Sequence, residues 1–273
     1  MKEKTISFLH SGDMGDIIAS LPTVKEICER EKAKAILYLD TSGGMLINED
    51  EDINKAICIQ SNNRGLKFND AGYEFLAPLL QFQDYIEKVE KYSGPHLCHI
   101  DHNLNAFRMA FRDKEISRKT NQNLMYLHQV ACGLEFGYKG PWLKVPSIDN
   151  GEHYDTVLAR TSRYQSAHVF FAAYENRLKK AHFLGTDFEY ALWENAFGFR
   201  PIRHEVKNAL EAAIVISKSD NFLSNGTLFY WIALGIGHKR IVHELGVDVP
   251  TTYGKDFPNV MFIRGFHEVR ERK

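Results

Sequence analysis

The sequence predicts an α/β protein of two domains, residues 1–145 and residues 146–273. Residues 5–10 are rich in β-forming side chains, and a glycine turn and an amphipathic stretch follow them. Residues 35–39 form a short apolar run between polar segments, which is typical of a buried parallel strand. Residues 137–151 hold three glycines and two prolines without a clear period. Strands and helices alternate again beyond this stretch, so two successive α/β units joined by a linker explain the order.

The first domain opens with a strand–helix–strand unit over residues 5–39. Its helix has an apolar face at helical spacing, formed by Ile17, Ile18, Leu21, Val24 and Cys28. Pro22 lies inside this helix and is expected to kink it. Residues 40–69 are polar and rich in glycine and asparagine, and we interpret them as a solvated insertion.

Two further helices are expected in the first domain. Asn69 or Asp70 is suited to cap the first, which would run through Gln83. Thr120 is suited to cap the second, which would end near Gly133. The apolar face of this second helix consists of Leu124, Leu127, Val130, Ala131 and Leu134.

The second domain repeats the alternation of strands and helices. We expect strands at residues 156–159, 182–184, 222–223, 240–242 and 260–263. We expect helices at residues 168–178, 187–197 and 209–217, and a further one that follows Thr227 and runs through Leu234. Gly198 is placed to close the helix over 187–197.

Composition argues against several classes of protein. Lys and Arg total 34 against 35 Asp and Glu, so the net charge of -1 gives no overall attraction to nucleic acid or to anionic membranes. No apolar run approaches the roughly 20 residues of a membrane helix, and the N-terminus lacks the pattern of a signal peptide. The four cysteines are far apart in sequence and are expected to be reduced, buried thiols. We therefore expect a cytoplasmic protein.

The turn after the first strand contains two glycines and two carboxylates. Gly12 and Gly15 allow a tight turn and a close approach of the backbone to a ligand, and a helix starts there with free N–H groups. Asp13 and Asp16 would repel a phosphate, and suit binding or deprotonation of a hydroxyl better. The alternative is that either aspartate only caps the helix. The third glycine of the dinucleotide-binding fingerprint is missing, which argues against a nicotinamide-dependent oxidoreductase.

Two loops of the second domain have the composition of an anion site. Arg160 and Arg163 follow a strand and are able to clamp an anionic group, although a solvated basic turn is the alternative. Asn225, Gly226 and Thr227 stand between a strand and an apolar helix, where hydroxyl, amide and N–H groups are able to bind a diphosphate. An ordinary helix cap is the alternative for these residues.

Carboxylates near strand ends are candidates for binding a ribose diol. Glu189 and Glu244 both have this position, and a surface role is the alternative for each. A run of three histidines, His96, His99 and His102, suggests metal ligands, but its spacing matches no standard zinc motif and would place His99 on the opposite face of a strand. We expect no metal and no cofactor.

The order of these parts resembles the family 9 glycosyltransferases, the ADP-heptose:lipopolysaccharide heptosyltransferase type. Residues 14–22 resemble the family's Leu-Gly-Asp…Leu-Pro start, which implies that Asp16 is the general base for the acceptor hydroxyl. Asn225 to Thr227 resemble its phosphate-binding loop, and Glu189 matches a glutamate implicated in binding the ribose. The resemblance implies two Rossmann-like domains facing a cleft, the GT-B fold. It also implies metal-independent transfer from a nucleotide-diphosphate sugar to a glycan or lipid-linked acceptor, and leaves peripheral membrane contact open.

A closer resemblance is to a bacterial branch with a Pro-Leu-Leu…Gln-x-Tyr-Ile segment followed by Asp-x-Asp-x-Phe-Arg, here residues 78–86 and 103–108. The sequence departs from the pattern at several positions. Asn103 and Asn105 replace the acidic pair, and Tyr230 stands in the region of an expected histidine. The lysine that the family pattern places in the phosphate loop of the second domain is absent here, and Arg160 and Arg163 are the candidates to replace it. These departures motivate the alternative of a non-catalytic nucleotide- or glycan-binding protein.

Overall fold

The chain divides into two compact units, Met1–Gly137 (unit 1) and Tyr138–Lys273 (unit 2). The computed structural model describes residues 4–42, 44–47, 57–60, 68–95, 98–148, 151–166, 171–246, 250–264 and 268–269. The division precedes the expected boundary at 145/146 because part of the linker packs on unit 2. The backbone N–H groups of Trp142 and Leu143 both donate to the carbonyl of Gly235 at 2.9 Å.

Unit 1 is built on a parallel four-stranded sheet. Its strands are β1 (Thr5–His10), β2 (Lys34–Leu39), β5 (Ile86–Lys91) and β6 (His102–Asn103). The spatial order is β5-β2-β1-β6, which is 3-2-1-4 in chain order and is the first part of the Rossmann arrangement. The strand order therefore reverses between β1 and β6. In open α/β sheets, ligands bind at the carboxyl edge beside such a reversal.

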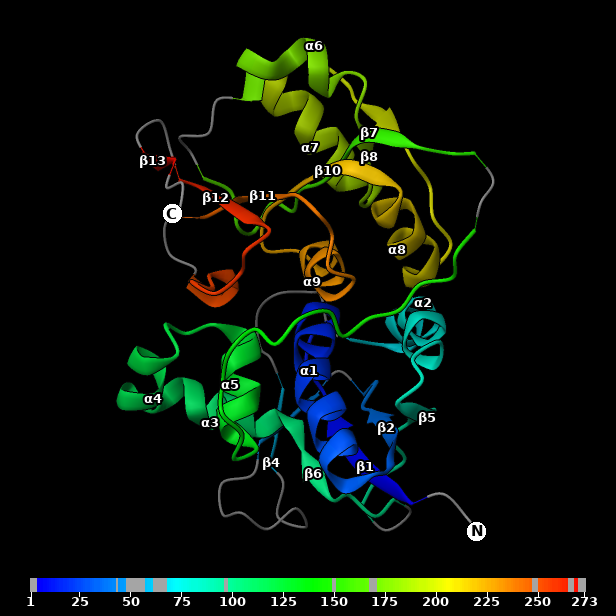
Figure 1. Ribbon diagram of the computed structural model, residues 1–273, viewed down its shortest axis with the longest axis vertical. Helices are drawn as coiled ribbons and strands as arrows, with labels where there is room; N and C mark the ends of the chain where they lie inside the picture. The colour runs from blue at the N-terminus through cyan, green and yellow to red at the C-terminus, as the bar shows by residue number, and fades with distance from the viewer. Residues whose placement is uncertain are drawn as a thin grey trace. The chain divides into compact units, whose positions relative to one another are not determined.

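The helices of unit 1 begin at polar residues and bury one apolar side. They are α1 (Met14–Glu31), α2 (Asp70–Gln81), α3 (Phe107–Arg112), α4 (Lys114–Lys119) and α5 (Leu124–Ala131), with a 3-10 turn at Leu104–Ala106. All five apolar positions predicted for α1 are buried, and this helix packs against α5 (Figure 1). Asn69 caps α2, as expected. The prediction for Thr120 was wrong, because Thr120 ends α4 and Asn123 caps α5 through Tyr126 N.

The expected insertion at residues 40–69 lies largely outside the described residues. Its described part includes an antiparallel pair, β3 (Gly44–Ile47) and β4 (Ile57–Gln60), which the sequence did not predict. Cys28 is buried, as expected, and burial raises the pKa of its thiol to about 12. Cys98 and Cys132 are only partly buried, and the side chain of Cys58 lies outside the description.

Unit 2 is built on a larger sheet with the complete Rossmann order. Its strands are β7 (Tyr154–Ala159), β8 (His182–Phe183), β9 (Ile202–Arg203), β10 (Ser219–Ser224), β11 (Ile241–Glu244), β12 (Val260–Arg264) and β13 (Glu268–Val269). The order is β13-β12-β11-β10-β7-β8-β9, and only β13 pairs antiparallel. Here the strand order reverses between β7 and β10.

The helices of unit 2 are short and cover an aromatic core. They are α6 (Glu175–Leu178), α7 (Asp187–Phe197), α8 (Ala209–Ser217) and α9 (Leu228–Gly235), with 3-10 turns at Phe171–Tyr174 and Pro250–Thr252. The helix expected over 168–178 is a 3-10 turn followed by α6, and its first three residues lie outside the described ones. Trp193 is 1% exposed and packs with Phe171 and Phe183. Across the described ranges, no helix is long and apolar enough to cross a membrane.

Candidate functional site

An asparagine joins the two loops at the strand reversal of unit 1. Ser11 follows β1, and Asn105 lies just beyond β6. The Asn105 Oδ1 atom accepts from Ser11 N at 3.0 Å and from Ser11 Oγ at 2.9 Å, and Asn105 is fully buried. Its Nδ2 donates to Asn103 Oδ1 at 2.9 Å. These bonds fix the loop that leads into α1.

Gly12 makes room for two side chains that fold back over the turn. A β-carbon on Gly12 would stand 2.6 Å from His10 Cε1 and 2.8 Å from Asp16 Oδ2. The Gly12 N–H donates to His10 Nδ1 at 2.9 Å. Asp13 occupies the N-cap of α1 without a capping bond from its side chain, and Gly15 lies in the first turn. The turn therefore places the Asp16 carboxylate at the carboxyl edge of β1.

Arg108 is the cation beside Asp16, and our sequence reasoning gave it no role. Its Nη2 lies 3.5 Å from Asp16 Oδ2, and both side chains are about one fifth exposed, at 22% and 23%. The guanidinium lies 4.7 Å from the centre of the Phe107 ring. Burial lowers the pKa of Arg108, and Asp16 and Asp13 partly oppose this shift. The available sequence signal for Arg108 was its place at the end of the Asp-x-Asp-x-Phe-Arg-like segment, residues 103–108.

Two buried histidines lie beneath this pair. His10 and His128 are both fully buried, with ring centres 5.2 Å apart, and His128 lies 4.2 Å from the Phe107 ring. Burial lowers the pKa of His128 to about 3 and holds the pKa of His10 well below its usual value. Both imidazoles are therefore neutral near pH 7, and Arg108 supplies the positive charge near Asp16.

Unit 2 repeats the asparagine bridge at its own strand reversal. Asn225 follows β10 and is fully buried. Its Oδ1 accepts from Thr161 N at 2.9 Å, and its Nδ2 donates to Thr161 O at 2.8 Å. The predicted phosphate ligand Asn225 thus ties the loop after β10 to the loop after β7.

Arg160 and Glu244 were predicted separately as donor-binding residues, and the structure pairs them. Arg160 Nε lies 2.7 Å from Glu244 Oε2, and Nη2 lies 2.9 Å from Oε1. The two side chains are 5% and 0% exposed. Ser166 N also donates to Glu244 Oε1, at 2.5 Å. A forked ion pair of this kind satisfies both charges inside unit 2.

The remaining residues of the predicted phosphate loop are also engaged. Thr227 caps α9 by accepting from Tyr230 N at 3.2 Å, which is the cap considered as the alternative. The ring of Tyr164 covers Gly226, because a β-carbon there would stand 2.8 Å from Tyr164 Cδ2. Arg163 contacts the Tyr164 hydroxyl and stacks on the same ring.

Glu189 is separate from this group. Its Oε2 accepts from Thr186 N at 2.8 Å and from Thr186 Oγ1 at 3.0 Å, while Glu189 N donates to Thr186 Oγ1 at 3.2 Å. These bonds form a capping box at the start of α7. The pattern Thr-x-x-Glu before an apolar helix was the available sequence signal for this role.

The histidine run does not form a cluster in the described residues. His99 Nε2 lies 3.0 Å from Asp101 Oδ1, and His96 lies outside the description. Within the described part of the chain, no group of three or more His, Cys, Asp or Glu side chains is placed to hold a metal ion.

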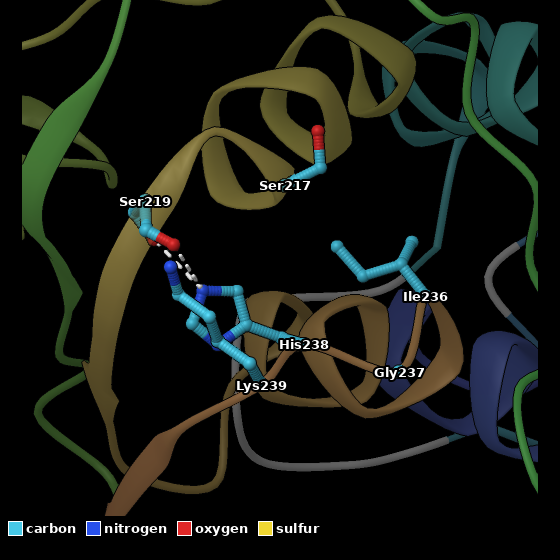
Figure 2. Close-up of a pocket in the computed structure, with 6 residues that line it drawn as sticks. All are labelled: Ser217, Ser219, Ile236, Gly237, His238 and Lys239. Atoms are coloured by element: carbon cyan, nitrogen blue, oxygen red, sulfur yellow. Dashed lines mark hydrogen bonds between the residues drawn. The ribbon is translucent and has the colours of Figure 1, made fainter.

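A small pocket of unit 2 lies at the amino edge of the sheet and contains none of the predicted residues. It encloses about 180 Å³ and is lined by Ser217, Ser219, Ile236, Gly237, His238 and Lys239 (Figure 2). His238 Nε2 contacts Ser219 Oγ at 2.9 Å and Ser219 O at 3.0 Å, and its Nδ1 accepts from Arg240 N. These bonds satisfy both ring nitrogens of the imidazole.

Comparison with known proteins identifies the fold. The sequence matches no family model and no curated protein. Among solved structures it is similar to a family 9 glycosyl transferase from Veillonella parvula DSM 2008, with TM-score 0.57 and 11% identity over 96% of this chain and 86% of that one. It is also similar to E. coli heptosyltransferase WaaC with ADP-2-deoxy-2-fluoro heptose, with TM-score 0.55 and 11% identity over 95% of this chain and 93% of that one. It is similar as well to E. coli ADP-heptose LPS heptosyltransferase II, with TM-score 0.50 and 9% identity over 97% of this chain and 91% of that one.

The fold is therefore that of the GT-B glycosyltransferases: two α/β units, each built on a sheet that is parallel apart from β13 at the edge of unit 2. Within that class, the three solved structures named above are a family 9 glycosyl transferase and two heptosyltransferases. The α/β, GT-B-like fold with two Rossmann-like units, expected from the sequence, is thus confirmed.

Proposed function

We propose that the protein is a metal-independent glycosyltransferase that moves a sugar from a nucleotide-diphosphate sugar to a hydroxyl of a glycan or lipid-linked acceptor. The observation that carries the proposal is the placement of Asp16 in a GT-B fold. Its carboxylate lies at the strand reversal of unit 1, over Gly12 and beside Arg108. A neighbouring guanidinium stabilises a carboxylate in its ionised form, which is the form that a general base needs. Asp16 would take the proton of the acceptor hydroxyl as it attacks the sugar.

The donor diphosphate is assigned to the carboxyl edge of unit 2. The N-terminus of α9 presents backbone N–H groups and a partial positive charge beside Gly226 and Thr227. Arg163, on the neighbouring loop, adds a full positive charge, and Arg160 and Asn225 fix the two loops in place. Charge stabilisation of the departing diphosphate would supply the larger share of the rate. Glu189 and Glu244 are already engaged, so we leave the ribose contact unassigned.

The test is Asp16→Asn, which keeps the shape of the side chain and removes its basicity. We expect release of nucleoside diphosphate from a panel of nucleotide-diphosphate sugars to be abolished, while nucleotide affinity by calorimetry stays unchanged. Glu29→Gln, an exposed position on the same helix, is the matched control and should retain activity. Unchanged turnover in Asp16→Asn would remove Asp16 from the mechanism.

A second function, a non-catalytic nucleotide- or glycan-binding protein, is favoured by the internal pairing of the donor-side residues. Arg160 is neutralised by Glu244, and Asn225 is bonded to Thr161. A thermal-shift screen with nucleotide-diphosphate sugars separates the two functions. Stabilisation without hydrolysis or transfer supports the binding protein, and no stabilisation by any nucleotide counts against both.

A further inference from the structure

Tyr164 is wedged between two glycines at the carboxyl edge of unit 2. A β-carbon on Gly226, after β10, would stand 2.8 Å from Tyr164 Cδ2 and 3.2 Å from its Cγ. A β-carbon on Gly246, after β11, would stand 3.2 Å from both the carbonyl carbon and the oxygen of Tyr164. Each glycine therefore has Tyr164 in the space that a side chain would fill.

The backbone does not explain these glycines. Neither Gly226 nor Gly246 has a positive φ, so an L-residue would fit the conformation of the chain at both positions. Space is the remaining reason. A glycine at the start of a helix lets a ligand approach the free N–H groups closely. At Gly226 the group that uses this space is the protein's own aromatic ring.

The loop that carries Tyr164 is fixed on both sides of the ring. On one side Arg160 is paired with Glu244 and Thr161 is bonded to Asn225. On the other side Ser166 N donates to the same Glu244 carboxylate. Tyr164 lies between these anchors and is only half-buried. Its side chain is thus able to turn outward while the anchors stay in place.

We propose that Tyr164 occupies part of the nucleotide site in the empty protein and leaves it when a nucleoside diphosphate binds. This inference rests on the proposed function, because it assumes that the diphosphate binds at Gly226 and the start of α9. Displacement of the ring also breaks its contact with Arg163, whose guanidinium then turns to the diphosphate. While the ring occupies the site, nucleotide cannot bind. The apparent affinity is therefore the affinity of the open site multiplied by the fraction of molecules in which the site is open.

The test compares Tyr164→Ala with Tyr164→Phe. Calorimetry with ADP, UDP, GDP and dTDP should show about tenfold tighter binding of the preferred nucleotide by Tyr164→Ala. Tyr164→Phe keeps the ring and loses only the hydroxyl, so its affinity should stay within about twofold of the unmodified protein. Tyr164→Ser provides a second removal of the ring if the alanine variant does not fold.

The outcomes separate this inference from the proposed function. If the unmodified protein binds a nucleotide and the alanine or serine variant binds it equally or more weakly, the ring does not block the site and the inference is overturned. Weaker binding would identify the ring as a platform for the nucleotide. If neither protein binds any of the four nucleotides, the proposed donor site itself is wrong.

Discussion

Acid should destabilise unit 1 through His128. This imidazole is fully buried among the rings of Phe107 and His10, and burial lowers its pKa to about 3. In the unfolded chain its pKa is about 6.5. The folded pKa is the lower one, so His128 has no effect on stability well above pH 6.5. As the pH falls from 6.5 toward 3, His128 becomes protonated in the unfolded chain and stays neutral in the folded chain. Protonation therefore favours the unfolded chain, and the free energy of unfolding falls. Between pH 7 and pH 5 the loss from this one group is about 2 kcal/mol.

The assay is urea unfolding at pH 7 and pH 5 of the unmodified protein and of His128→Phe, which keeps an aromatic ring and removes the titration. All three tryptophans, at positions 142, 193 and 231, lie in unit 2, so tryptophan fluorescence reports the unfolding of that unit. Circular dichroism reports the loss of helix and strand in both units, and therefore also follows unit 1. His128→Phe should lose about 2 kcal/mol less than the unmodified protein when unit 1 is taken to pH 5. The fluorescence transition should keep its own acid sensitivity, because His243 in unit 2 also has a pKa of about 3. An equal loss in His128→Phe and the unmodified protein would refute the argument from burial.

Two substitutions test the contacts of unit 2, with tryptophan-detected urea unfolding as the measurement. Glu244→Ala leaves the buried Arg160 guanidinium without its partner and should cost about 3–5 kcal/mol. An unchanged midpoint would show that the pair does not form. Thr186→Ala removes the cap of α7 and should cost about 1 kcal/mol. A change below a few tenths of a kcal/mol would argue against the capping box.

The long helices and strands could be predicted because the spacing of their apolar residues is visible within a short stretch of sequence. The apolar face of α1 and the alternation of β2 follow directly from the order of residues. β5 escaped prediction because charged residues separate its two buried positions, Ile86 and Val89. β6 and β9 are two residues long, and neither lies in an apolar run such as Phe183–Leu184 at the equally short β8.

The candidate site was only partly predictable because its contacts join distant parts of the chain. Sequence position placed Arg160, Asn225 and Glu244 near strand ends, and the sheet order brings these ends together. Their mutual bonds could not be foreseen, since Arg160 and Glu244 are 84 residues apart. Partners can be read from the sequence only where they lie close together in it, as Thr186 and Glu189 do in their capping box.

The two asparagine bridges hold the loops at the strand reversals without adding a charge there. An amide carries no charge at any pH, so Asn105 and Asn225 hold their loops equally well in acid and in base. An aspartate at position 225 could accept from Thr161 N but, once ionised, could not donate to Thr161 O, and its charge would repel a diphosphate. The asparagines thus hold these loops without adding charge, and in unit 2 the Arg160–Glu244 pair holds them with its two charges matched. Evolution or protein design is then free to retune the charges at 16, 108 or 163 while the frame around them stays the same.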